Sequence, residues 1–327
     1  MSDPSPGAEV TVTVTVPASS ANLGPGFDSI GLALGVWDVC TASVSAEPGV
    51  RISVAGSGDG EVPLDESHLV YRTMVHTWSV LNAPVPTGLT LRCHNRVPHG
   101  RGMGSSATAI VTGIVAAQAI WDLQRGHDGP VDLAVANDIA AALEGHPDNS
   151  SASVYGGLTL SWTDDSDEER TRTVRPPLHP EVDVVVFVPA VQLSTAKARS
   201  VLPTQVRLGD AARNSARAAL LIHALGRDPS LLPAATREWL HQEPRRPAYP
   251  ASMALVDRIR AAGHAAVISG AGPSVLVLTT REAMDEVRHL GGETWSVLTP
   301  GVPTVGAHVV ADAVVASPGA TNLETAR

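Results

Sequence analysis

Residues 98–107 read Pro-His-Gly-Arg-Gly-Met-Gly-Ser-Ser-Ala, so three glycines and two serines stand directly in front of a long apolar run. Glycine has no Cβ and accepts positive φ angles, so such a loop can bring several backbone N–H groups close to a bulky anion. The apolar run predicts a helix over about 104–121, whose positive dipole end points at the same place. The segment therefore predicts either a phosphate-binding loop or a glycine-rich turn before an ordinary helix.

The basic residues narrow the kind of phosphate site that this loop can form. The chain has a single lysine, Lys197, and its other basic side chains apart from histidine are arginines. A Walker loop needs a Gly-Lys-Ser/Thr sequence, and protein kinases need a lysine on an early strand, so both classes are excluded. If the loop binds nucleotide phosphates, it does so through backbone amides, serines, a metal ion and arginine.

The length, charge and cysteine content limit the general class of protein. A chain of 327 residues favours two domains, and the break in pattern around 165–180 predicts domains at 9–172 and 173–318. The formal charge of −10 opposes nonspecific binding to nucleic acid or to an anionic membrane. Cys40 and Cys93 form neither a metal-binding spacing nor a disulfide framework, and no signal peptide or membrane span is recognisable. These features predict a cytoplasmic protein.

Hydrophobic periodicity predicts an α+β chain. Residues 10–16 alternate valine with threonine, which indicates a strand that ends at Pro17, and a turn-rich loop is expected over 18–28. Tails are expected at 1–8 and from about 317, and an exposed acidic turn at 164–169. Further strands are expected near 29–46, 51–55, 87–94, 155–162, 182–188, 264–269, 274–279 and 306–314, and further helices near 67–81, 130–143, 194–201, 209–225, 230–240, 250–261 and 281–290.

Two further glycine segments stand at 22–28, Asn-Leu-Gly-Pro-Gly-Phe-Asp, and at 269–274, Ser-Gly-Ala-Gly-Pro-Ser. Together with the 98–107 loop, and in this order, they resemble the three signature motifs of the GHMP small-molecule kinases over residues 10–315. The resemblance implies the GHMP kinase fold, with an N-terminal domain like the second domain of ribosomal protein S5 and a ferredoxin-like C-terminal domain.

Within that family the chain is most similar to the homoserine kinases. The similarity lies in Ser-Ala-Asn-Leu-Gly-Pro-Gly-Phe-Asp at 20–28, Glu-Gly-His-Pro-Asp-Asn at 144–149, Leu-Ser-Thr-Ala-Lys-Ala-Arg at 193–199 and His-Gln-Glu-Pro-Arg at 241–245. It implies phosphorylation of the side-chain hydroxyl of L-homoserine by ATP with Mg²⁺, a step toward threonine, in a homodimer.

The resemblance also assigns the nucleotide and metal residues. Ser106 and Glu144 match the family's Mg²⁺ ligands, although a glutamate at a helix end is by itself more often an ordinary solvated carboxylate. The resemblance also suggests residues 67–70 as the ones that contact the adenine base. The expected ATP-binding residues are those of the glycine loop: Pro98, Gly100, Arg101, Gly102, Met103, Gly104, Ser105, Ser106 and Ala107.

An amino-acid acceptor is a zwitterion with a hydroxyl, so its pocket needs a cation, an anion and a polar group at the reacting end. Arginine suits the carboxylate because its planar fork binds two oxygens, and the resemblance gives that role to Arg245. Arg199 is expected to reach the transferring phosphate or the acceptor. The other expected acceptor contacts are Asn22 and Asp28 at the ammonium group, Asn149 at the hydroxyl, and Gly270 and Gly272.

The chemistry near the hydroxyl is expected to lack a strong side-chain base. Related kinases carry an aspartate where this chain has Asn149, and an amide cannot take a proton. Transfer is then expected to rely on the metal ion, the helix dipole and Arg199. Thr195, His146 and Asp148 are the remaining catalytic candidates, and His146 is otherwise an ordinary loop histidine.

Several residues depart from the homoserine kinase pattern close to the expected acceptor site. Ser150 and Ser151 replace small apolar residues, Pro244 replaces an aromatic, and residues 206–210 lack a histidine. These changes make Arg246 an alternative carboxylate clamp. They also leave two other functions open: a GHMP kinase for a different hydroxy-amino acid or alcohol, and a ligand-binding protein of the same fold without turnover.

Overall fold

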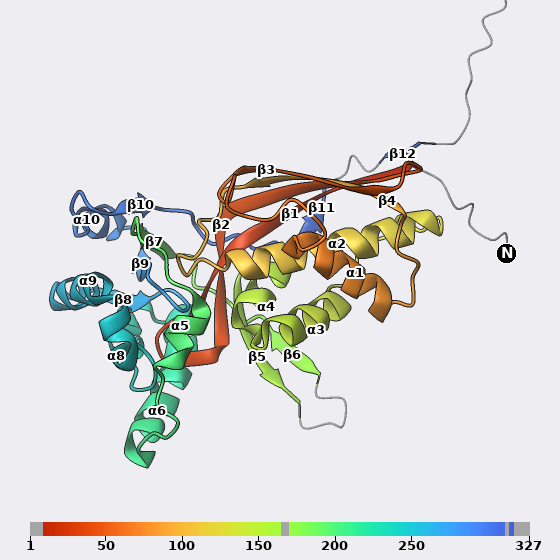
Figure 1. Ribbon diagram of the computed structural model, residues 1–327. Helices are drawn as coiled ribbons and strands as arrows, with labels where there is room; N and C mark the ends of the chain where they lie inside the picture. The colour runs from red at the N-terminus through yellow and green to blue at the C-terminus, as the bar shows by residue number, and fades with distance from the viewer. Residues whose placement is uncertain (1–8, 165–169, 311–313, 317–327) are drawn as a thin grey trace, which may run out of the picture.

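The computed structural model describes residues 9–164, 170–310 and 314–316, so the predicted tails and residues 165–169 of the predicted acidic turn lie outside the described residues. The chain forms two lobes, each built on one sheet, and in the larger lobe the helices α1 to α4 lie on one side of the strands β1 to β4 (Figure 1). The larger sheet has the order β11-β1-β2-β4-β3, with β12 beside β1, β5 beside β2 and β6 beside β5. Its strands are β1 (Glu9–Asn22), β2 (Gly26–Ser45), β3 (Gly49–Gly56), β4 (Gly88–Asn95), β5 (Leu158–Thr163), β6 (Thr171–Val174), β11 (His308–Val309) and β12 (Val314–Ala316).

The smaller sheet has the order β10-β7-β9-β8. It consists of β10 (Ser296–Leu298), β7 (Val182–Val188), β9 (Val275–Thr280) and β8 (Ala265–Ile268). The chain passes from β6 of the larger sheet to β7 of the smaller one, and β11 and β12 then return to β1. The domain limits 9–172 and 173–318 stay a prediction.

Helix α2 (Ser105–Gln124) is the central helix of the larger lobe and lies against β1, α1 and α3. By length and composition alone α2 could cross a membrane, but 72% of its most apolar 18-residue window is buried inside the protein. The surrounding helices of this lobe are α1 (Leu69–Val80), α3 (Leu133–Glu144) and α4 (Pro147–Tyr155). The second lobe holds α5 (Thr195–Ser200), α6 (Leu208–Gly226), α7 (Leu232–Ala235), α8 (Gln242–Arg245), α9 (Pro250–Ala261) and α10 (Met284–His289).

The first strand does not end at Pro17, contrary to the prediction. β1 continues to Asn22, and the register against β2 shifts between Pro17 and Ala18. A proline is tolerated at such an irregularity because the hydrogen-bond ladder is interrupted there. The expected loop over 18–28 shrinks to a short turn between Asn22 and Gly26, which leaves Ser19 and Ser20 in a buried strand beside the glycine loop.

Two helical segments also differ from the predictions. The expected helix over 230–240 is a 3₁₀ turn, Pro229–Leu231, followed by α7, which ends before Thr236. Helix α4 was not expected because its sequence has no apolar stripe. Its buried face carries Ser150, Ser151 and Ser153: Ser151 and Ser153 find polar partners in other elements, and Ser150 bonds to the Pro147 carbonyl oxygen in the same helix.

The glycine loop packs tightly on the 269–274 segment, and this contact gives a testable expectation. Gly102 has φ +72°, and a Cβ added there would lie 2.3 Å from the Ser269 carbonyl oxygen. Gly60 has nearly the same φ, +71°, but a Cβ there meets nothing within 4 Å. Both substitutions by alanine carry a backbone cost of about 1–2 kcal/mol. We expect Gly102→Ala to lower the melting temperature clearly more than Gly60→Ala, as thermal unfolding monitored by circular dichroism would measure. Equal shifts would contradict the tight packing.

Candidate active site

The three glycine segments meet at one place between the lobes. The loop joins β4 to α2, and Gly100, Gly102 and Gly104 all adopt left-handed φ angles of +64°, +72° and +73°. The 269–274 segment binds the loop through Ser269 Oγ, which donates to the Gly102 carbonyl oxygen at 2.6 Å. The Ser19 N–H of β1 donates to the Met103 carbonyl oxygen at 3.1 Å. The loop is thus fixed from both lobes.

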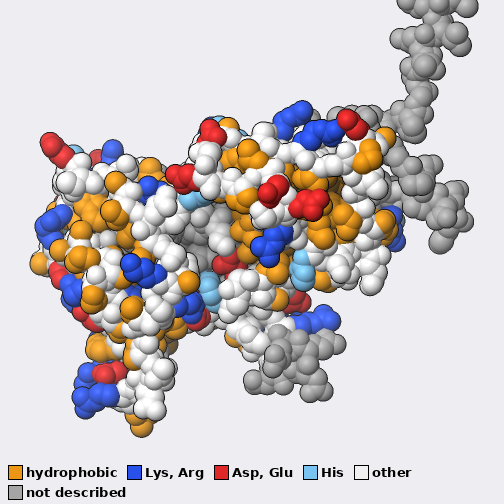
Figure 2. Space-filling model, in the orientation of Figure 1, with side chains coloured by type: hydrophobic (Ala, Val, Ile, Leu, Met, Phe, Trp, Pro, Cys, Tyr) orange, Lys and Arg blue, Asp and Glu red, His pale blue; other side chains and the backbone are white. Residues whose placement is uncertain are grey.

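A cavity of about 70 Å³, here called the central cavity, opens beside this loop. The surface is hollowed between the two lobes (Figure 2). The cavity brings together most of the residues that the sequence singled out. Its lining consists of Asn22, Gly100, Gly102, Gly104, Ser105, Ser106, Ala107, Glu144, His146, Asp148, Asn149, Leu193, Thr195, Arg199, Arg245, Gly270 and Ala271.

Five of the predicted binding residues lie outside this lining: Asp28, which is described below with Arg199, and Pro98, Arg101, Met103 and Gly272. The Met103 side chain is fully buried, and Gly272 packs against the Tyr249 ring. Pro98 and Arg101 line a separate hollow on the other side of the loop. The Arg101 guanidinium donates to the carbonyl oxygens of His99, Pro189 and Ala190, which anchors the loop to the second lobe. Pro98, Arg101, Met103 and Gly272 therefore shape the loop and its packing, and they do not line the central cavity.

Ser106 and Glu144 form a pair of oxygen donors at the start of α2. Ser106 Oγ donates to Glu144 Oε1 at 2.6 Å. Glu144 is the last residue of α3, where the negative end of the helix dipole disfavours a carboxylate. Its position at the N-terminus of α2 offsets that effect and places a hydroxyl and a carboxylate oxygen side by side in the cavity.

His146, Asp148 and Asn149 follow at the start of α4. His146 Nδ1 and Asp148 Oδ1 are 2.9 Å apart, and Asp148 Oδ1 also accepts the Asn149 N–H. Burial lowers the pKa of His146, but the hydrogen bond and the charge of Asp148 outweigh it, so the pKa is raised above its ordinary value. Asn149 Oδ1 accepts a hydrogen bond from Ser19 Oγ at 3.2 Å, so the strand orients its amide.

Arg199 lines the cavity and forms a two-point ion pair with Asp28, which lies outside the lining. Arg199 Nη2 and Nη1 lie 2.6 and 3.2 Å from the two carboxylate oxygens of Asp28. Asn22 fastens the same turn, because its amide oxygen accepts the Asp28 N–H and its amide nitrogen donates to the Gly270 carbonyl oxygen. Burial lowers the pKa of Arg199, but Asp28 raises it more. Both polar atoms of the Asn22 side chain thus already bond to backbone groups.

The Arg245 guanidinium lines the cavity although the residue is only 1% exposed. Its Nε donates to the Ala198 carbonyl oxygen at 2.9 Å, and among the described residues no carboxylate lies within 4.0 Å of it. Burial therefore lowers its pKa. Arg246, the alternative clamp, faces solvent and pairs with Glu243 at 2.6 Å and Asp257 at 2.8 Å. The structure therefore points Arg245, and not Arg246, at the cavity.

The two serines that depart from the homoserine kinase pattern also lie outside the cavity lining. Ser151 Oγ donates to Asn137 Oδ1 at 2.7 Å and lies 3.2 Å from Thr173 Oγ1, which joins α4 to α3 and β6. Ser150 Oγ donates to the Pro147 carbonyl oxygen within its own helix. Both residues are fully buried. Ser150 and Ser151 therefore belong to the packing of α4 and do not line the central cavity.

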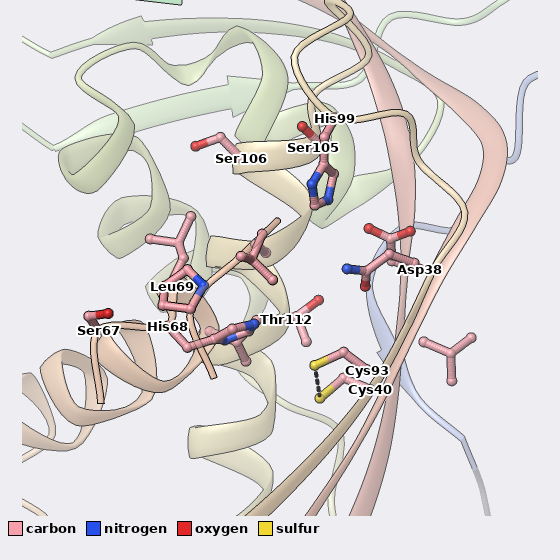
Figure 3. A pocket seen from close by; sticks show the side chains of 16 residues that line it. Asp38, Cys40, Ser67, His68, Leu69, Cys93, His99, Ser105, Ser106 and Thr112 are labelled. Atoms are coloured by element: carbon pink, nitrogen blue, oxygen red, sulfur yellow. Dashed lines mark hydrogen bonds between the residues drawn. The ribbon is translucent and has the colours of Figure 1, made fainter. Parts of the chain in front are cut away.

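A second cavity of about 300 Å³, here called the side cavity, shares Ser105 and Ser106 with the central one (Figure 3). Its wall includes the cross-strand pair Cys40 and Cys93 and the beginning of α1, where His68 Nδ1 is buried without a hydrogen-bond partner among the described residues. The buried carboxylate of Asp38 accepts the backbone N–H groups of Arg96 and Val97 and the hydroxyl of Thr108. Asp38 therefore fixes both ends of the glycine loop.

The sequence of this chain matches those of a known protein family over most of its length. The sequence profile of the GHMP kinases N terminal domain matches residues 68–157, and that of the GHMP kinases C terminal matches residues 217–294. Homoserine kinase from Streptomyces avermitilis is 47% identical over 299 residues, which cover 91% of this chain and 95% of that protein. The chain belongs to the GHMP kinase family. A second GHMP relative, homoserine kinase from Clavibacter michiganensis, is 43% identical over 303 residues, covering 91% of this chain and 93% of that protein.

Solved structures confirm the predicted GHMP kinase fold. The crystal structure of homoserine kinase from Cytophaga hutchinsonii matches with a TM-score of 0.79 and 25% identity, over 92% of this chain and 97% of that chain. Putative homoserine kinase from Listeria monocytogenes matches with a TM-score of 0.73 and 28% identity, over 91% and 99%. Among the GHMP kinases, this chain is thus similar to homoserine kinases in sequence and in structure.

Some residues that shape this GHMP kinase site were missed by the sequence reasoning. Ser19 orients Asn149, and Ser269 binds both Gly102 and Ser20, yet neither was singled out for such a role. Asp38 was placed in a strand without any role. The pair Ser19-Ser20, which Ala21 separates from Asn22, is the one available signal, because buried serines in a valine-rich strand need partners.

Proposed function

We propose that this chain transfers the γ-phosphoryl group of ATP to the side-chain hydroxyl of L-homoserine and forms O-phospho-L-homoserine, a step toward threonine. The observation that carries the proposal is the buried Arg245 guanidinium, which lines the cavity beside the glycine loop with no carboxylate partner among the described residues. A buried cation without a counterion favours an anionic ligand. Relatives at 43–47% identity that are named homoserine kinase support the same choice.

In this proposal the nucleotide spans both cavities. Its phosphates lie at the glycine loop, where backbone N–H groups and the N-terminus of α2 favour negative charge. Its base lies in the side cavity, near residues 68–70. The Ser106 hydroxyl and the Glu144 carboxylate fit Mg²⁺, because both are hard oxygen donors and lie side by side at that helix end. When bound there, Mg²⁺ supplies neutralisation of the phosphate charge.

The acceptor then fills the central cavity. Arg245 binds its carboxylate and Asn149 holds the hydroxyl that reacts, while Asp28, paired with Arg199 at the edge of the cavity, attracts its ammonium group. Asn149 cannot accept a proton, so the residues near the hydroxyl act chiefly by position and charge. Arg199 neutralises the transferring phosphoryl group, and His146, Asp148 and Thr195 line the same wall as the remaining proton carriers.

A panel of acceptors tests the substrate. ADP release is measured by a coupled assay with ATP and Mg²⁺ and with L-homoserine, L-serine, L-threonine or 3-aminopropan-1-ol as acceptor. We expect the highest kcat/KM with L-homoserine, because Arg245 and Asn149 line one cavity and would bind its carboxylate and its hydroxyl, and because the relatives at 43–47% identity are named homoserine kinase. A higher kcat/KM with another acceptor would identify a different GHMP kinase. Tight binding of ATP and homoserine without ADP release would identify a ligand-binding protein.

We propose that the chain forms a homodimer. Light scattering on the protein as it elutes from a size-exclusion column would then give a mass of about twice the 33.8 kDa of one chain. A cytoplasmic location agrees with the two buried free cysteines among the described residues.

A further inference from the structure

His241 lies behind Arg245 and outside the central cavity. It precedes α8, and its side chain is fully buried. The ring atom Nε2 lies 2.8 Å from the Gly24 carbonyl oxygen, and Nδ1 lies 3.4 Å from Arg245 Nη1. A carbonyl oxygen only accepts hydrogen bonds, and a guanidinium only donates them. Nε2 must therefore carry the proton and Nδ1 the lone pair, so both contacts require the same neutral tautomer.

The surroundings hold the His241 ring in this position. The Glu238 carboxylate accepts the backbone N–H groups of Leu240, His241 and Gln242, which fixes the backbone before α8. The Phe27 ring stacks on the His241 ring, with centroids 5.1 Å apart and an interplanar angle of 26°. The same Phe27 ring lies 5.7 Å from the Arg245 guanidinium carbon. The histidine thus connects the 22–28 turn with the helix that carries Arg245.

These contacts restrict the Arg245 guanidinium without neutralising it. Ala198 takes the Nε–H and His241 takes one hydrogen of Nη1, and the Tyr249 phenol also interacts with the guanidinium. The two acceptors hold the guanidinium plane in one orientation, and the guanidinium still lines the central cavity, where a ligand can reach it. A carboxylate in place of the His241 ring would neutralise the positive charge of Arg245, which is needed to bind the carboxylate of the acceptor.

We propose that His241 is a positioning residue for the acceptor carboxylate, holding the Arg245 fork through the lone pair of Nδ1. The inference rests on the proposed function, since it takes the carboxylate to be that of homoserine. Burial lowers the pKa of His241, and the charge of Arg245 acts in the same direction against the opposing effect of Glu238. The neutral ring is therefore maintained around pH 7.

The experiment compares two replacements of His241. In His241→Asn an amide oxygen can stand near the position of Nδ1 and accept from Arg245. In His241→Gln the amide reaches toward Gly24 and the acceptor for Arg245 is lost. Losing a hydrogen bond to a charged group corresponds to about tenfold or more in affinity. We expect His241→Gln to raise the KM for homoserine by about tenfold, with the KM for ATP within about twofold, and His241→Asn to recover part of the loss.

Two further measurements separate positioning from general damage to the fold. His241→Gln is combined with Arg245→Met, and we expect the effect of His241→Gln on the homoserine KM to vanish in that background. The exposed His76 on α1 provides the control His76→Gln, which should leave both KM values unchanged. Melting temperatures of all variants check that the fold is retained.

The outcomes distinguish this inference from the function on which it rests. An unchanged homoserine KM in His241→Gln, or an equal rise in the KM values of homoserine and ATP, would overturn the positioning role. A persistent effect in the Arg245→Met background would overturn it as well. If the wild-type protein does not phosphorylate homoserine at all, the proposed function fails and this inference fails with it.

Discussion

Glu144→Ala is expected to lower kcat by about 100-fold or more at saturating ATP and homoserine, the scale for losing one preorganised electrostatic group. The reason is its position, because Glu144 Oε1 accepts from Ser106 Oγ at 2.6 Å beside the glycine loop. Ser106→Ala should act in the same direction. Glu144→Gln keeps the shape and removes the charge, so it should raise the Mg²⁺ concentration needed for half-maximal rate. Steady-state kinetics over a Mg²⁺ series measure all three effects.

The control for this prediction is Glu282→Ala, which removes an exposed glutamate before α10. Its kcat and its Mg²⁺ requirement should match the wild type. A near-normal kcat of Glu144→Ala at saturating Mg²⁺ would refute the assignment of the metal ligands. Melting temperatures of the variants show whether a loss of activity is caused by unfolding.

Arg245→Met is expected to raise the KM for homoserine by about 30-fold or more, because removing one partner of a buried charge pair costs about 2–5 kcal/mol. The KM for ATP should stay within about twofold. Without ligand, Arg245 is a buried cation with no carboxylate within 4.0 Å among the described residues, so its removal should leave the melting temperature unchanged or raise it. Kinetics and thermal unfolding of one protein preparation test both statements.

Arg246→Met is the matched control for that variant. Arg246 is the next residue but pairs with Glu243 and Asp257 at the surface, so its removal should leave both KM values within about twofold. If Arg246→Met raises the homoserine KM and Arg245→Met does not, the clamp has been assigned to the wrong arginine.

The parts of the fold that the sequence predicted correctly depend on local chemistry. The three loop glycines, the serines behind them and the long apolar run specify a turn and a helix from within one short segment. β1 beyond Pro17 and all of α4 were missed because their polar residues are buried, and most of these find their hydrogen-bond partners in other elements of the fold. Ser19 with Asn149 and Ser151 with Asn137 are such pairs, separated by 130 and 14 positions in the chain.

For the expected site residues, too, the sequence predicted the place of some side chains and missed the orientation of others. The glycine loop, Glu144 and Arg199 do line the central cavity. The Arg101 side chain turns to the carbonyl oxygens of the second lobe, and both polar atoms of Asn22 bond to backbone groups. Position in a motif therefore predicted where a residue lies, but its hydrogen-bond partners decided which way the side chain points.

The sequence by itself determined a lysine-free glycine loop in front of a helix and, through three ordered glycine motifs, the GHMP kinase family. Those properties follow from the conformations open to glycine and from the residue types within short segments, so they do not depend on distant parts of the chain. Only the tertiary structure decided that Arg245 and not Arg246 faces the cavity, and that Asp28 pairs with Arg199. Neighbouring residues on a helix point in directions about 100° apart, so the packing of α8 against the rest of the lobe selects which arginine is buried.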